Sequence, residues 1–215
     1  MSKPLVILGS GGHASVVADI LLNQGKIVVA TISPDEIEDS SPLKGIKRLT
    51  TDAKLLDAYS PEEVDLVNGL GALPGNTLRT KLFNYFSDYG YKFQSVIAPS
   101  AIIAGGVILE DGVQVMHGAI IQTNASIAKN CIINSGSIVE HDCVVGPHNH
   151  IAPSATLSGA VITGNQVHIG TGANVIQSIN IGERAVIGAG CTVIRDVKAG
   201  QVIVPARNRV IREES

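Results

Sequence analysis

The sequence predicts an α/β domain with a mainly parallel, Rossmann-like sheet over residues 1–95, followed by a parallel β-helix over residues 96–215. Two observations lead to this fold class. In the second part an aliphatic residue recurs at every sixth position from Ile97 to Val193, and only Thr163 breaks the column. In the first part, apolar strand-like segments lead into glycine-rich turns and helical patterns, which is typical of a parallel sheet.

The first strand and its turn predict a site for a phosphate group. Residues 3–8 are largely apolar and lead into residues 9–14, Gly-Ser-Gly-Gly-His-Ala, which a helical pattern follows. Glycines let a ligand approach the backbone, and a helix N-terminus offers free N–H groups and a favourable dipole. Gly11, Gly12 and His13 are therefore candidate ligand-binding residues. The alternative is tight packing of the helix on the strand without a ligand.

The same turn also matches the dinucleotide fingerprint, so a nicotinamide-dependent oxidoreductase is one alternative function. The second strand, residues 27–32, ends in Ser33, Pro34 and Asp35. No acidic residue stands at the tip of this strand, where one would bind a ribose hydroxyl of NAD. The pattern therefore favours a different nucleotide.

A second glycine-rich loop, residues 67–76, lies between a short strand and a helix predicted over residues 77–88. Ligands of open parallel sheets lie outside the carboxyl ends of the strands. We therefore expect this loop, including Gly71, to line the same crevice as the first. Arg79 and Lys81 either neutralise phosphate there or lie on a solvated helix face.

Two further columns follow the period of six. Four residues after most aliphatic positions stands a small or modest apolar residue, and both columns are expected to point inward. Three residues after the aliphatic position, successive repeats carry residue types that tolerate positive φ, which predicts a sharp corner in each unit. These residues are Gly106, Gly112, Gly118, Asn124, Asn130, Gly136 and Asp142. We expect apolar positions such as Val107, Val161 and Val167 on an outward face that joins subunits.

The composition excludes several classes of function. The net charge of −3 and the pI near 6.0 provide no basic footprint for nucleic acid. No run of eighteen apolar residues exists and residues 1–12 lack the pattern of a signal peptide, so we expect a cytoplasmic protein without a membrane span. Cys131, Cys143 and Cys191 share the inward column, which predicts buried thiols rather than a disulfide or a metal site.

These columns resemble the hexapeptide repeat of the left-handed β-helix acyltransferases. The resemblance implies a left-handed parallel β-helix of hexapeptide repeats, with three six-residue units in each triangular coil. It also implies a homotrimer and an acyl-coenzyme A bound in the cleft between neighbouring prisms.

A coil of eighteen residues places His141 at an outward corner, with Thr123 and Gly159 in the adjacent coils, each roughly 4.8 Å away. We expect Gly159 to leave open space beside the imidazole and its own N–H free to face that space. A base beside an amide donor suits acyl transfer to an amine, since the base removes a proton and the amide binds the oxyanion. Asp142 would orient His141 or raise its basicity.

Two other interpretations of these histidines remain open. His141 is one of six histidines, so it can be an ordinary exposed corner residue. His150 and His168 stand eighteen residues apart and should stack, but no third ligand is evident, and zinc sites use three or four. We therefore predict no metal.

Nearly the whole chain resembles the sugar O- and N-acetyltransferases of the sialic acid and bacillosamine type. The similarity lies in residues 9–13, 68–76, 133–143, 150–153 and 157–159. It implies that His141 is the general base, that Asp142 is its acidic partner and that the Gly159 N–H binds the oxyanion.

The same resemblance implies where the two substrates bind. His150, Gly159 and Arg207 would contact acetyl-CoA. The nucleotide-sugar would be held by Gly11, Gly12 and His13, together with Ser33, Pro34, Asp35 and Gly71.

The resemblance implies transfer of an acetyl group from acetyl-CoA to the 4-amino group of a nucleotide-linked amino-dideoxysugar, as in members that act on GDP-perosamine. Paired acidic residues follow the second strand in many members that use UDP-sugars, whereas this chain has Ser33-Pro34-Asp35-Glu36. The base is therefore left open. The alternatives are O-acetylation of sialic acid, N-acetylation of a UDP-4-amino-sugar, the oxidoreductase, and a non-catalytic trimeric scaffold.

Overall fold

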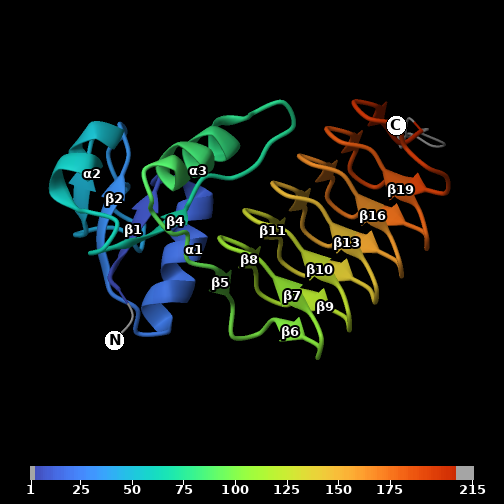
Figure 1. Cartoon of the computed structure of the whole chain (residues 1–215), viewed down its shortest axis with the longest axis horizontal. Coiled ribbons are helices and arrows are strands. Elements are labelled where there is room, and N and C mark those ends of the chain that lie inside the picture. The colour runs from blue at the N-terminus through green and yellow to red at the C-terminus, as the bar shows by residue number, and fades with distance from the viewer. Residues whose placement is uncertain (1–2, 207–215) are drawn as a thin grey trace, which may run out of the picture.

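The computed structural model describes residues 3–206, and it confirms an α/β part with a parallel sheet followed by a left-handed parallel β-helix (Figure 1). The first part has the strand order β3-β2-β1-β4. Its elements are β1 (Leu5–Leu8), α1 (Gly12–Asn23), β2 (Val28–Ile32), β3 (Lys47–Leu49), α2 (Asp52–Ala58), β4 (Asp65–Asn68) and α3 (Leu78–Asp88).

Strand β1 is buried on both faces, as expected for the centre of a parallel sheet. Leu5 and Ile7 pack in a cluster with α1, whereas Val6 and Leu8 pack in a second cluster with α2 and α3. The first cluster also contains Val96, Ala98 and Met116 of the β-helix, so α1 joins the two parts. All strands of the sheet pair in parallel, and their carboxyl ends meet at one edge.

The β-helix consists of three parallel sheets, one on each side of a triangular prism. Sheet 1 contains β5 (Val96–Ile97), β8 (Gln114–Val115), β11 (Ile132–Ile133), β14 (His150–Ile151), β17 (His168–Ile169), β20 (Val186–Ile187) and β22 (Val202–Ile203). Sheet 2 contains β6 (Ile102–Ile103), β9 (Ile120–Ile121), β12 (Ile138–Val139), β15 (Thr156–Leu157), β18 (Asn174–Val175) and β21 (Thr192–Val193). Sheet 3 contains β7 (Ile108–Leu109), β10 (Ser126–Ile127), β13 (Val144–Val145), β16 (Ile162–Thr163) and β19 (Asn180–Ile181).

The coil length is eighteen residues, because strands pair with the strands eighteen positions away, as in Ile138 with Thr156. The last coil is shorter, since Val186 pairs with Val202. The predicted corners are confirmed, since φ is positive at every sixth residue from Gly106 to Gly190. Beyond the first seven corners the chain uses residues with less tolerance for this conformation, such as Ala160 at φ 57°. A left-handed conformation costs such a residue roughly 1–2 kcal/mol, so the stacking of the coils imposes it.

The interior contains the two predicted columns, but the residues predicted for an outward face are wrong. Val161 and Val167 are buried in the interior cluster, and Val107 packs against it. These valines stand four residues after Ile103, Leu157 and Thr163 of the six-residue column, which is an inward position of the repeat. The apolar side chains that do point outward include Ile102, Ile108, Val144 and Ile162, which are 61%, 61%, 47% and 47% exposed.

Thr163, which breaks the aliphatic column, has a buried polar partner. The side-chain amide of Asn149 donates to its hydroxyl at 2.5 Å, and the backbone N–H of Val167 donates to the Asn149 carbonyl oxygen at 2.6 Å. Asn149 also stands in an inward column. Thr163 and Asn149, two polar residues at inward positions, thus form a hydrogen bond with each other, as buried polar groups require.

Candidate active site

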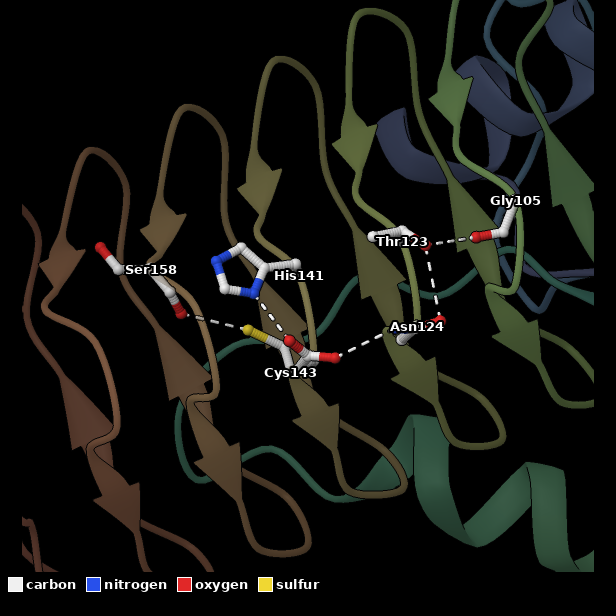
Figure 2. Close-up of polar contacts among 7 residues, drawn as sticks. Gly105, Thr123, Asn124, His141, Cys143 and Ser158 are labelled. Carbon is white, nitrogen blue, oxygen red and sulfur yellow. Dashed lines mark hydrogen bonds and ion pairs between the residues drawn. The ribbon is translucent and has the colours of Figure 1, made fainter.

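His141 lies at the corner between sheets 2 and 3, and its side chain is 57% exposed. Its Nδ1 lies 2.8 Å from Oδ2 of Asp142, and the side-chain amide of Asn124 donates to Oδ1 of the same carboxylate at 3.2 Å (Figure 2). A carboxylate only accepts hydrogen bonds, so Nδ1 of His141 carries the proton. The lone pair is then on Nε2, as a general base requires.

Asp142 is suited to hold this imidazole in place. Its backbone lies at φ 59°, which aspartate tolerates, and its N–H donates to the carbonyl of Thr123 in the preceding coil. The hydrogen bond from His141, and after it the bond from Asn124, lowers the pKa of the Asp142 carboxyl. The carboxylate is therefore ionised and can stabilise an imidazolium. Asn124 was missed in the sequence, although it stands eighteen residues before Asp142.

Gly159 lies directly beside the imidazole of His141. A Cβ atom at residue 159 would come within 2.6 Å of both Cε1 and Nε2 of His141. The open space expected there is taken by the imidazole ring itself. Gly159 does not have a left-handed φ, so glycine is needed for the ring and not for the backbone. Within residues 3–206 the N–H of Gly159 has no hydrogen-bond acceptor, which leaves it available to an oxyanion.

Cys143 also lies next to this corner, but it is not suited to be a nucleophile. Its thiol is buried and donates to the carbonyl of Ser158 at 3.2 Å (Figure 2). Burial raises the pKa of the thiol, which disfavours the reactive thiolate. The other two cysteines, Cys131 and Cys191, are buried free thiols as predicted.

Four of the seven candidate nucleotide-binding residues line a second region, a cavity of about 740 Å³ at the carboxyl ends of the parallel strands. Gly11, Ser33, Pro34 and Asp35 contribute to its wall. The Ser10 hydroxyl donates to the Ser33 hydroxyl at 2.8 Å and so joins the two loops. The volume of this cavity suits a small organic ligand.

Backbone groups, and not basic side chains, offer the contacts for phosphate. Helix α1 begins after Gly11 without a side-chain cap, so the N–H groups of its first turn are open to an anion. Of the described side chains that line the cavity, none is basic. Arg48 lies behind the wall and donates to the carbonyls of Ser33, Pro34 and Asp35 at 3.0–3.3 Å, which shapes this loop.

His13 lies on the side of the glycine loop that faces the β-helix. Its Nε2 is 2.8 Å from Oε1 of Gln114 in β8, and its Cβ lies next to Gly71 of the second loop. Burial lowers the pKa of the imidazole to about 4. The structure thus brings His13 and Gly71 together as expected. Nothing in the sequence indicated that Gln114 contacts His13.

Arg79 is buried, so its interpretation as a cation on a solvated helix face is wrong. Its guanidinium donates to the carbonyls of Asn68, Leu70 and Asn130 at 2.8, 2.6 and 3.4 Å. It therefore fastens the second loop to the corner between sheets 3 and 1. Lys81, two residues further along α3, is exposed.

His150, the candidate coenzyme contact, also joins the two parts of the chain. Its Nδ1 lies 2.8 Å from the carbonyl of Ala72 and its Nε2 lies 3.0 Å from the side-chain amide of Asn134. Both ring nitrogens thus have protein partners. Burial lowers the pKa of this imidazole to about 4. It lies next to His168 of the adjacent coil as predicted, with ring centroids 4.9 Å apart in an edge-to-face arrangement. No group of three potential metal ligands occurs in the described part of the chain.

The candidate residues fall into two groups that one chain does not bring together. His13, Gly71 and His150 lie on or above sheet 1, whereas His141 and Gly159 lie at the corner between sheets 2 and 3. In a triangular prism this corner is opposite sheet 1. Arg207, the third coenzyme contact expected, lies outside the described residues. No helix between residues 3 and 206 is long and apolar enough to span a membrane.

Two family models match separate segments of the chain. Residues 4–86 match the family model described as the PglD N-terminal domain. Residues 124–159 match the model of the bacterial transferase hexapeptide with six repeats.

Solved structures similar to this chain include three of nearly equal length. PerB from Caulobacter crescentus, in complex with CoA and GDP-perosamine, is 32% identical with a TM-score of 0.82, and the match covers 93% of each chain. The acetyltransferase domain of PglB from Neisseria gonorrhoeae is 28% identical with a TM-score of 0.84, over 94% of this chain and 96% of that one. WeeI from Acinetobacter baumannii, at 23% identity and a TM-score of 0.82 over 98% of this chain and 100% of that one, shares the fold.

Two further structures concern variants of the Caulobacter enzyme. One histidine is replaced by asparagine in the first and by alanine in the second. Both variants are in complex with CoA and GDP-perosamine. That enzyme therefore retains both ligands in the crystal when this histidine is absent.

We predict that stability falls on acidification. Burial lowers the pKa of His13, His148 and His150 from 6.5 to about 4, so the unfolded chain binds protons at a higher pH than the folded one. The contribution is complete above pH 6.5 and is lost as the pH falls toward 4. Urea unfolding measured from pH 7.5 to 4 should show this decline.

His150→Asn should reduce the slope of stability against pH, because one of the three groups is removed. His117→Asn is the control, since this histidine is exposed at another corner. Equal slopes in the wild type and in the His150 variant would contradict the prediction.

Proposed function

Since the chain belongs to the hexapeptide-repeat family of sugar acetyltransferases, we propose that it N-acetylates the 4-amino group of a nucleotide-linked amino-dideoxysugar with acetyl-CoA. The preferred acceptor in this proposal is GDP-perosamine, the ligand named for the Caulobacter relative. The observation that carries the proposal is the arrangement of His141, Asp142 and Gly159. A base with a free Nε2 lies against Gly159, whose N–H has no acceptor among residues 3–206.

The proposed reaction is a direct attack. The sugar nitrogen attacks the thioester carbonyl carbon, and Nε2 of His141 removes the proton from the nitrogen as the C–N bond forms. The carbonyl oxygen gains negative charge and accepts a hydrogen bond from the N–H of Gly159. The C–S bond then breaks, and the thiolate of CoA takes the proton from the imidazolium. Asp142 stabilises this imidazolium, as the acidic member of a catalytic triad does.

The buried state of Cys143 supports a mechanism without an acyl-enzyme, because its thiol is protonated and hydrogen-bonded to Ser158. For the nucleotide we propose the cavity beside Gly11, Ser33, Pro34 and Asp35, with the diphosphate at the N-terminus of α1. For acetyl-CoA we propose the cleft between neighbouring β-helices. Both ring nitrogens of His150 have protein partners, so His150 would contact acetyl-CoA through the face of its ring. Otherwise its hydrogen bond to Ala72 or to Asn134 would first have to break.

A site made by two chains follows from the same proposal. The sugar-binding residues lie above sheet 1 and the base lies at the opposite corner, so the base of a second chain must complete the site. The outward apolar side chains Ile102, Ile108, Val144 and Ile162 lie on sheets 2 and 3, where a subunit interface can bury them. We therefore propose a homotrimer with active sites between subunits.

We expect the wild-type protein to acetylate GDP-perosamine, and His141→Asn to lower kcat by roughly 100- to 10,000-fold because the general base is lost. KM should change little, since a histidine variant of the relative still holds both ligands. The assay compares GDP-, UDP- and dTDP-linked 4-amino sugars with free sialic acid. Preference for sialic acid or the absence of acetyl transfer would refute the proposed function, and an active His141→Asn would refute the proposed base.

Gly159→Ala should lower kcat by about 100-fold or more, because the new Cβ would displace the imidazole of His141 by roughly an ångström. Gly105→Ala is the matched control. Gly105 stands in the same column three coils earlier, and a Cβ there meets nothing within 4 Å. The steady-state rates of both variants test the requirement. A fully active Gly159→Ala would show that the imidazole need not lie against residue 159.

Two inactive variants should restore activity when they share a trimer. Gly11→Asp places a carboxylate at the proposed diphosphate site, where an added Cβ meets no atom within 4 Å. Co-expressed with His141→Asn, it should yield about a quarter of the wild-type activity, because that share of interfaces pairs an intact loop with an intact base. Each variant alone should be inactive. Lack of recovery in purified mixed trimers would place the whole site within one chain.

A further inference from the structure

The orientation of the Gln114 side chain follows from its buried surroundings. Its Nε2 lies 2.8 Å from the backbone carbonyl of Asn68, and that carbonyl also accepts from Arg79 at 2.8 Å. A carbonyl oxygen cannot donate, so the amide nitrogen of Gln114 must face it. The amide oxygen must then face His13. Because Gln114, Asn68 and Arg79 are 0%, 1% and 4% exposed, water does not replace these contacts.

This orientation determines where the proton of His13 lies. The amide oxygen of Gln114 only accepts, so Nε2 of His13 must carry a proton and donate at 2.8 Å. Burial and the neighbouring Arg79 charge disfavour a second proton and lower the pKa of the imidazole to about 4. Near neutral pH, Nδ1 of His13 is therefore a hydrogen-bond acceptor. Within residues 3–206 it has no protein partner.

Because Nδ1 of His13 is an acceptor, it can form a hydrogen bond only with a part of the nucleotide-sugar that has a donor. The oxygens of a diphosphate diester carry no proton near neutral pH, so they repel a lone pair. The cavity, the N-terminus of α1 and His13 lie in this order toward the β-helix. A ligand with its base in the cavity and its diphosphate at the helix would extend its sugar to His13. Sugar hydroxyl and amino groups can donate to Nδ1.

We propose that His13 is a specificity-determining residue that accepts a hydrogen bond from the sugar and does not bind the diphosphate, and that Gln114 is the positioning residue that fixes its tautomer. This inference rests on the proposed function for the ligand class. It adds that His13 contacts the sugar through Nδ1. It also explains the glutamine at residue 114, whose amide oxygen accepts from Nε2 of His13.

Binding of GDP and of GDP-perosamine, measured by calorimetry, separates the two halves of the ligand. His13→Ala should weaken GDP-perosamine by roughly tenfold, the effect of one lost hydrogen bond, and leave GDP within about twofold. His13→Asn should recover part of the loss, since its amide oxygen can take the place of Nδ1. His117→Ala is the control and should change neither affinity. Equal weakening of GDP and GDP-perosamine in His13→Ala would overturn the proposal.

The tautomer is tested without any ligand. In ¹⁵N-histidine-labelled protein near pH 7, the His13 signals, assigned by their loss in His13→Asn, should show a protonated Nε2 and an unprotonated Nδ1. Gln114→Glu should shift them toward imidazolium, because a buried carboxylate raises the pKa of a neighbouring histidine. A protonated Nδ1 in the wild type would overturn the inference while leaving the proposed acetyl transfer intact. Failure of the wild type to acetylate any nucleotide amino sugar would refute the proposed function and would not alter this tautomer measurement.

Discussion

The fold and the catalytic corner both depend on the stacking of coils in register every eighteen residues. A single coil cannot bury its apolar side, whereas stacked coils share one interior of aliphatic residues and small side chains. The register also decides which side chains meet at the corners. Asn124, Asp142 and Ala160 follow one another at this interval, as do Thr123, His141 and Gly159. An insertion of one residue within the intervening coil would move Gly159 away from His141 and turn apolar side chains outward.

The same geometry limits what one chain can do. Sheet 1 and the corner before it lie against the α/β part, because Gln114 and His150 of sheet 1 and Asn130 of that corner contact its loops. The corner with His141 is therefore the part of the prism that the α/β part of the same chain does not cover. A substrate held by one chain and a base supplied by another would make activity conditional on assembly. The exposed isoleucines and valine on sheets 2 and 3, which the α/β part does not cover, agree with assembly of several chains.

Much of this could be predicted from the sequence, because the repeat converts sequence distance into spatial distance. The inward columns, the positive-φ corners and the contact between His141 and Gly159 all follow from counting. The outward assignment of Val161 and Val167 failed although the period itself places them inward. The cavity beside Gly11 and Ser33 also agrees with the strand-loop-helix pattern, since parallel strands bring their carboxyl ends together.

The contacts between the two parts could not be predicted, because no period relates residues of the α/β part to those of the prism. Arg79 resembles a surface cation in the sequence, yet three backbone carbonyls surround it. Burial of His13, and after it the charge of Arg79, lowers the pKa of His13 and keeps it neutral. Arg79 also donates to the carbonyl of Asn68, which is the contact that orients Gln114. Buried polar groups with defined donors and acceptors permit few arrangements, so this network holds the loops in one geometry. The β-helix thereby acts on the ligand site as well as on the base, because Gln114 of β8 sets the hydrogen-bonding character of His13.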